Sequence, residues 1–133
     1  MPVRKVKAAF IQPMLLQRRE HLPERADWIY ELKLDGYRAL AIKTEGKVRL
    51  RSRNDNDFNH RYPSIVKVLA RLPNETVVDG EVLALDESGK PSFNALQNYD
   101  SSHPEIFFYV FDLLILAGRK VMPEPLSVRR TFA

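Results

Sequence analysis

The chain contains no cysteine and no long uninterrupted hydrophobic segment. Without cysteine it can form neither disulfide bonds nor thiolate metal sites, although this absence does not identify the cellular compartment. No run reaches the roughly 18 apolar residues of a membrane-spanning helix, and the first residues lack the apolar core of a signal peptide. We therefore expect a cytoplasmic protein that does not bind membranes.

What is present is typical of one small globular domain. The chain is 44% hydrophobic, which is enough for a single core. Its 133 residues are too few for two ordinary domains. The net charge of +4 fits a nucleotide or nucleic-acid partner, but many small basic domains bind neither. Charge alone therefore carries little weight.

The hydrophobic pattern predicts an α+β fold with a mainly antiparallel sheet and packed helices. Apolar residues alternate over 28–34, as in a pleated strand, and recur at helical spacing after Pro63. Residues 1–27 show little periodicity, and we expect them to form an irregular segment across the sheet. The other expected elements are a hairpin of 39–43 and 47–52, a helix over 63–72, a strand over 76–85, a short helix near 93–97, a strand buried throughout over 106–116, and a helix capped by Ser127.

A lysine lies between two acidic residues near the end of the first expected strand. The run Glu31-Leu32-Lys33-Leu34-Asp35-Gly36-Tyr37-Arg38 carries Lys33 on the strand, and Asp35-Gly36 then forms a turn. A lone lysine in such a place is usually just solvated. The order of acid, lysine, acid, glycine and arginine favours a catalytic role.

Lys33, Asp35, Gly36 and Arg38 form a Lys-x-Asp-Gly-x-Arg pattern. It resembles the nucleophile motif of the covalent nucleotidyltransferases, a superfamily of ATP-dependent DNA ligases, RNA ligases and mRNA capping enzymes. Further stretches follow in the order of that superfamily's later motifs, and they look most like the ligase domain of bacterial end-joining DNA ligases. The resemblance covers the chain from about Pro13 to Arg130 and implies an ATP-grasp-like nucleotidyltransferase (adenylation) domain.

Each of the later stretches also has a structural alternative. Ser52-Arg53-Asn54 matches the second motif, whereas the preceding Arg49 and Arg51 could form a solvated edge. Asp79-Gly80-Glu81 resembles the motif whose glutamate contacts ribose or metal, but a bulge glycine between exposed acids would look the same. Phe111 begins a Phe-Asp-Leu-Leu stretch whose ring is implied to stack on adenine, and a core phenylalanine is the simpler alternative.

The resemblance implies that Lys33 attacks the α-phosphate of ATP and retains AMP, which then passes to the 5′-phosphate of a nick. The neutral amine is the nucleophile, and a free lysine with a pKa of about 10.4 is almost fully protonated near neutral pH. Desolvation and nearby cations would lower that pKa, whereas Glu31 would raise it.

The resemblance also assigns the other site residues. Glu31 would contact the adenine amino group, and Phe111 would cover the adenine ring. Arg38 and Arg53 would hold phosphate or ribose. The implied nucleotide ligands are thus Glu31, Lys33, Arg38, Arg53, Glu81 and Phe111, with Glu81 also the candidate ligand of Mg²⁺.

The pattern of the family continues beyond the motifs found here. After Asp112 the only lysine is Lys120, so the closing two-lysine motif is missing, as are the acidic metal motif before it and the OB-type domain. We therefore expect residues 1–133 to be the N-terminal part of one adenylation domain. Its expected partners are ATP, nicked double-stranded DNA, and a complementing ligase segment or a second copy. The alternatives are a non-catalytic nucleotide- or DNA-binding module of the same fold and an RNA ligase or capping-type enzyme.

Overall fold

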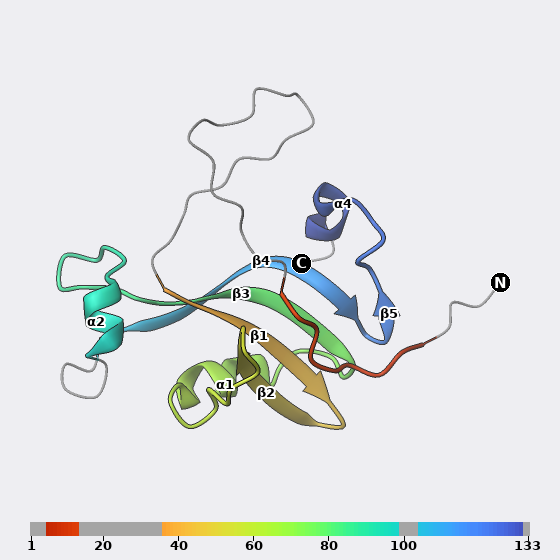
Figure 1. The fold of residues 1–133 in the computed structure, drawn as a ribbon, viewed down its shortest axis with the longest axis horizontal. Helices are drawn as coiled ribbons and strands as arrows, with labels where there is room; N and C mark the ends of the chain where they lie inside the picture. Colours follow the sequence, from red (N-terminus) through yellow and green to blue (C-terminus); the bar gives the residue numbers. More distant parts are fainter. Residues whose placement is uncertain (1–4, 14–35, 99–103, 132–133) are drawn as a thin grey trace.

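The structure, a computed structural model, describes residues 5–13, 36–98 and 104–131. The predicted strand over 28–34 lies outside these described residues, and with it Glu31 and Lys33. Within the described part of the chain, the fold is built on a five-stranded antiparallel sheet of order β2-β1-β3-β4-β5 (Figure 1). The strands are β1 (Tyr37–Thr44), β2 (Lys47–Ser52), β3 (Thr76–Ala84), β4 (Ile106–Leu116) and β5 (Arg119–Lys120).

The predicted hairpin is confirmed as β1 and β2. Its strands are joined by Glu45 and Gly46, which have φ angles of 52° and 77°. Two consecutive residues with positive φ are what a two-residue hairpin needs to match the twist of its strands. The backbone amide of Gly46 also donates to the side-chain oxygen of Asn74 over 2.9 Å, which ties the turn to the loop before β3.

One face of the sheet packs against α1 (Pro63–Leu69) and α2 (Phe93–Gln97). Figure 1 shows α1 beside β2 and α2 at one end of the sheet. Pro63 begins α1, where its missing N–H costs no hydrogen bond, and the Ser92 side chain accepts from the amide of Ala95 at the start of α2. The core between helices and sheet includes Ala39, Ala41, Leu50, Tyr62, Ile65, Leu69, Val78, Val82 and Leu96.

The first helix is shorter than predicted. It ends at Leu69, after which Arg71 and Leu72 make i→i−3 backbone bonds ahead of Pro73. Such bonds tighten the chain into a narrower turn. Val68, an apolar residue of this helix, is 64% exposed, whereas Ile65 and Leu69 are buried.

The last long strand has the predicted bounds, but the prediction that it is buried throughout was wrong. Leu113, Leu114 and Ile115 are buried, whereas Phe107 and Tyr109 are 46% and 49% exposed. Side chains alternate along the strand, so Ile106 and Phe108 pack against the core while Phe107 and Tyr109 project to the other face, where the apolar cluster formed with residues 5–13 does not extend to them.

The opposite face of the sheet is partly covered by residues 5–13, which we call the N-terminal strap. The amide of Val6 donates to the carbonyl of Gly118 over 2.7 Å, and the amide of Ala8 donates to the carboxylate of Glu75. Ala8 is buried in a second apolar cluster with Leu40, Ile42, Val77, Leu114 and Ile115. The predicted irregular segment across the sheet is thus confirmed for its described part.

The last helix, α4 (Leu126–Thr131), packs against β4. It begins one residue before Ser127, so Ser127 lies within the helix and does not cap it as predicted. Among the described residues, no helix is long and apolar enough to cross a membrane.

We expect the attachment of the strap to depend on the ionisation of Glu75. Hydrogen bonds from the Thr44 hydroxyl, at 2.5 Å, and from the Ala8 amide hold the pKa of this carboxyl below its usual 4.5. A carboxyl with a lowered pKa stabilises the folded chain above the unfolded pKa, and that stability is lost as pH falls through the folded pKa. The Ala8 amide resonance should therefore titrate with a midpoint below 4.5.

Glu75→Gln should abolish this titration, and Glu124→Gln should leave it unchanged. A midpoint above 4.5, or a titration that persists in Glu75→Gln, would show that another group controls the strap.

Candidate functional site

The pairing register collects the predicted site residues of β1, β3 and β4 on one face. Residues directly opposite each other in an antiparallel pair project to the same side. Arg38 lies opposite Glu81, and Glu81 in turn lies opposite Tyr109. Asp79 lies opposite Asp112. These side chains share the face of the N-terminal strap, at the end of the sheet that the strap's apolar cluster does not cover.

Arg38 is bound to a residue that the sequence did not single out as a ligand. Its Nε and Nη2 donate to the two carboxylate oxygens of Asp79 at 3.2 and 2.7 Å. The side chains are 17% and 5% exposed, so this is a largely buried two-point pair, the strongest arrangement available to arginine. Asp79 lies diagonally across from Arg38, whereas the residue directly opposite is Glu81, which is half-buried.

Phe111 reaches the same place through an irregularity in β4. The partners of Asp79 and Gly80 on β4 are Asp112 and Val110, so Phe111 is an extra residue between them. Bulges of this kind re-aim side chains and are frequent beside functional sites. The Phe111 ring is half-buried, and the guanidinium carbon of Arg38 lies 5.4 Å from its centroid. The ring therefore faces the arginine rather than filling the core.

Gly80 is required by this close approach of β3 and β4. A Cβ atom at Gly80 would lie 2.4 Å from the carbonyl oxygen of Tyr109. Gly80 lies beside the bulge, whose extra residue is Phe111 of β4, and the alternative of exposed acids on either side of the glycine is wrong for Asp79. Asp79 is not a solvated acid, since it is 3% exposed and bound to Arg38.

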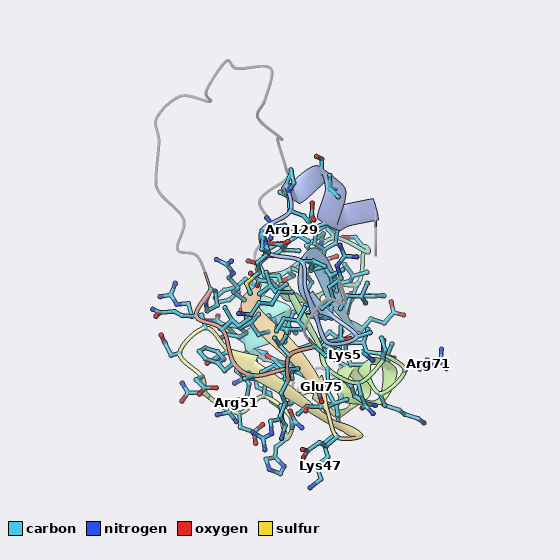
Figure 2. The ribbon with its side chains drawn as sticks, turned by 90° about the vertical axis from the view of Figure 1, so that its right-hand side faces the viewer. Lys5, Lys47, Arg51, Arg71, Glu75 and Arg129 are labelled. Carbon is cyan, nitrogen blue, oxygen red and sulfur yellow. The ribbon has the colours of Figure 1, made fainter. Side chains whose placement is uncertain are left out.

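Asp112 is held by an arginine from the last helix. Nη1 of Arg129 lies 2.9 Å from both carboxylate oxygens, and the amide of Leu113 donates to one of them over 2.8 Å. Figure 2 shows Arg129 between α4 and the sheet, at the opposite end of the molecule from Lys47. Sequence reasoning missed Asp79, Asp112 and Arg129, although an acid within an apolar strand was a signal for the first two.

Arg53 does not join this cluster. Strand β2 ends at Ser52, so Arg53 lies in the following turn, exposed, and its side chain has no hydrogen bond or ion pair to the rest of the described chain. The turn is completed by Asp55, whose φ of 61° lies in the left-handed region that aspartate adopts more easily than most residues. Arg53 continues the β2 edge beyond the pairing of Ser52 with Ala39.

The two arginines of β2, Arg49 and Arg51, line a groove beside the strap. Arg51 is paired with Asp55 over 2.8 Å, whereas Arg49 is exposed and has no ion pair within the described ranges. The groove has a volume of about 360 Å³ and an apolar floor that includes Ile42 and Phe10. Its rim is basic at Arg49, while Lys7 is paired with Glu45 over 2.5 Å, which raises the pKa of Lys7.

No group of three or more histidine or acidic side chains that could hold a metal ion occurs among the described residues. Glu81, the predicted metal ligand, therefore lacks a protein-built coordination set in this part of the chain. An ion there would need further oxygen ligands from the nucleotide, from water or from residues outside the described ranges, and Mg²⁺ in enzymes that use ATP is commonly bound through the substrate phosphates.

Comparison with known proteins decides the family. The model of the ATP dependent DNA ligase domain matches residues 13–132. This chain belongs to the ATP-dependent DNA ligase family. The predicted resemblance is thereby confirmed, and the α+β sheet architecture agrees with the solved ligase domains described next.

Three relatives of this ligase chain illustrate the similarity. It is 43% identical over 111 residues to the multifunctional non-homologous end joining protein LigD of Pseudomonas aeruginosa, covering 81% of this chain and 13% of that protein. It is 31% identical to the SPbeta prophage-derived DNA ligase-like protein LigB of Bacillus subtilis, covering 92% of this chain and 46% of that protein. The crystal structure of the ligase domain of M. tuberculosis LigD matches with a TM-score of 0.67 and 39% identity, over 77% of this chain and 34% of that one. The chain thus spans less than half the length of these relatives.

We expect Asp79→Ala to destabilise the ligase fold by about 2–3 kcal/mol, because it leaves the Arg38 guanidinium largely buried without its carboxylate. Breaking a fully buried pair typically costs about 3–5 kcal/mol, and the partial exposure of Arg38 reduces this. Chemical denaturation measures the effect. The control is Glu124→Ala, which removes a 4.0 Å pair with Arg119 at an exposed position and should change stability by less than about 0.5 kcal/mol. Equal effects of the two variants would contradict the assigned importance of the Arg38–Asp79 pair.

Proposed function

We propose that this chain is the N-terminal part of a DNA ligase adenylation domain. In the proposed reaction Lys33 displaces pyrophosphate from ATP and keeps AMP, which is then transferred to the 5′-phosphate of nicked DNA and released when the strand is sealed. The observation that carries the proposal is the register that brings Arg38, Glu81 and Phe111 to one face of the sheet. Arg38 belongs to the same motif as Lys33, so the nucleophile would be close to this face.

The relatives support both the nucleotide and the substrate. A mycobacterial DNA ligase D, 38% identical to this chain with a TM-score of 0.66, was solved in complex with ATP. The LigD proteins are named for non-homologous end joining, which supports broken or nicked duplex DNA as the substrate.

Different residues of the described chain would bind the different parts of AMP. The Phe111 ring offers a flat apolar surface for adenine, and Arg38 already lies against that ring. Glu81 would accept hydrogen bonds from ribose or contribute one oxygen ligand to Mg²⁺. The ion, when bound, would offset the charge of the phosphates. Glu31 and Arg53 complete the proposed set, at the adenine amino group and at phosphate or DNA.

We expect Lys33 to carry the AMP. Incubation with ATP and Mg²⁺ should raise the intact mass of the chain by one AMP, because Lys33 occupies the nucleophile position of the Lys-x-Asp-Gly-x-Arg motif. Lys33→Ala should abolish the gain, and the control Lys47→Ala, at an exposed position of the hairpin, should retain it.

An adduct that survives Lys33→Ala, or one that peptide mapping places on another lysine, would contradict the assignment. No mass gain together with measurable ATP binding would favour the alternative of a non-catalytic module.

We expect DNA binding by this chain to be weak, independent of sequence and sensitive to salt. Arg49→Ala should weaken it and flatten the slope of log K against log salt by about 0.9 for each phosphate that the variant no longer neutralises. Arg51→Ala should have a smaller effect, since Arg51 is already paired with Asp55. The control is Arg71→Ala, because Figure 2 shows Arg51 and Arg71 on opposite sides of the molecule. Fluorescence anisotropy with a labelled nicked duplex measures all three, and equal slopes for Arg49→Ala and Arg71→Ala would mean that the β2 edge is merely solvated.

A further inference from the structure

The bulge in β4 places two consecutive side chains on one face. In a regular strand Phe111 and Asp112 would point to opposite sides. Here Phe111 contacts Arg38, and Asp112 lies opposite Asp79, which also contacts Arg38. The extra residue of a bulge is left out of the regular ladder, so the pairing with β3 does not by itself fix Phe111.

What fixes the neighbouring Asp112 is its contact with α4. Nη1 of Arg129 binds both oxygens of the carboxylate, and the two side chains are 15% and 17% exposed. This ion pair also balances the charge across the strands, because the carboxylates of Asp79 and Asp112 occupy directly opposed positions, where like charges repel. Each carboxylate has its own arginine, Arg38 for one and Arg129 for the other.

We propose that the Asp112–Arg129 ion pair positions the Phe111 ring, so that the docking of α4 controls how the nucleobase is held. Without Arg129, the Asp112 carboxylate would lie opposite Asp79 with one counter-charge fewer, and the guanidinium that binds Asp79 is that of Arg38. Arg38 would then be shared between the two carboxylates and would leave its place against the ring. Neither member of the pair needs to touch the nucleotide, so both are positioning residues. The part of this inference that concerns the nucleobase rests on the proposed function, whereas the part that concerns the ring does not.

The ring is tested first, without nucleotide. In the 133-residue chain with ¹³C-labelled phenylalanine, the ring signal of Phe111 is assigned by its loss in Phe111→Leu. Arg129→Gln should shift and broaden this signal, and Arg129→Lys, which keeps the charge, should restore most of it. The double variant Asp112→Asn/Arg129→Gln removes both charges and should lie nearer to the original chain than Arg129→Gln alone.

The matched control is Arg119→Gln, which removes an arginine from an exposed ion pair in the same C-terminal part of the chain. It should leave the Phe111 signal unchanged. An unchanged Phe111 signal in Arg129→Gln overturns the proposal. If Arg129→Gln does not fold, Arg129→Lys and the double variant are each compared with the original chain, and a Phe111 signal that moves further in the double variant than in Arg129→Lys overturns the proposal as well.

The nucleobase is tested by comparing ATP with inorganic triphosphate, which lacks the base. Arg129→Gln should weaken ATP binding about fivefold or more, the range expected for the loss of base stacking, and leave triphosphate binding unchanged. In the Phe111→Leu background, Arg129→Gln should cause no additional loss, because the ring through which it acts is gone.

Equal weakening of ATP and triphosphate would overturn control of the nucleobase. If the ring signal moves as expected but Phe111→Leu leaves ATP affinity unchanged, the proposed adenine stacking fails while the positioning of the ring by Asp112 and Arg129 stands.

Discussion

The chemistry of this face depends on the neutralisation of two carboxylates at the centre of the sheet. Asp79 and Asp112 are directly opposed on β3 and β4, and both are mostly shielded from water. Two buried negative charges on directly opposed residues would be strongly unfavourable without counter-charges. The fold supplies Arg38 from β1 and Arg129 from α4, so two elements far apart in the sequence are tied to β3 and β4. The contact of Arg38 with Phe111 follows from that arrangement.

Much of the fold could be predicted from local patterns. The alternation over 39–52 and the Glu45-Gly46 pair are sufficient for a hairpin, because both the pleat and the turn are decided by neighbouring residues. The exposure of Phe107 and Tyr109 could not be predicted in this way. An apolar run is the same whether both faces of the sheet are covered or only one, and the segments that cover each face of β4 are far away in the sequence.

The same distinction between local patterns and distant contacts applies to the site residues. The motifs selected Arg38, Glu81 and Phe111, and the register brings these three to one face. Asp79 and Asp112 stood within the same motifs, but their opposed positions on β3 and β4 depend on the bulge at Phe111. No local pattern in the sequence marks where an extra residue is accommodated. Arg129 could not be predicted as a site residue, because nothing in the sequence of Leu126–Thr131 indicates which strand its arginine contacts.

The ion pairs also limit what each arginine can do for a nucleotide. Arg38 donates Nε and Nη2 to Asp79, so the fork that would grip a phosphate in two-point fashion is already engaged. Arg129 is similarly bound to Asp112, and Arg51 to Asp55. A phosphate could take over the bonded N–H groups of Arg38 or Arg129 only by displacing a carboxylate that would then lie largely buried without its arginine, which is costly. Asp55 is 49% exposed, so its release from Arg51 would cost little. Arg38 is therefore better suited to orienting the ribose and the adenine ring than to stabilising the charge that develops at the α-phosphate. The exposed Arg49 and Arg53, at the β2 edge, are not engaged in ion pairs among the described residues and are available to phosphate. The charge at the reacting phosphate would then have to be met by Lys33, by Mg²⁺ and by groups outside the described residues.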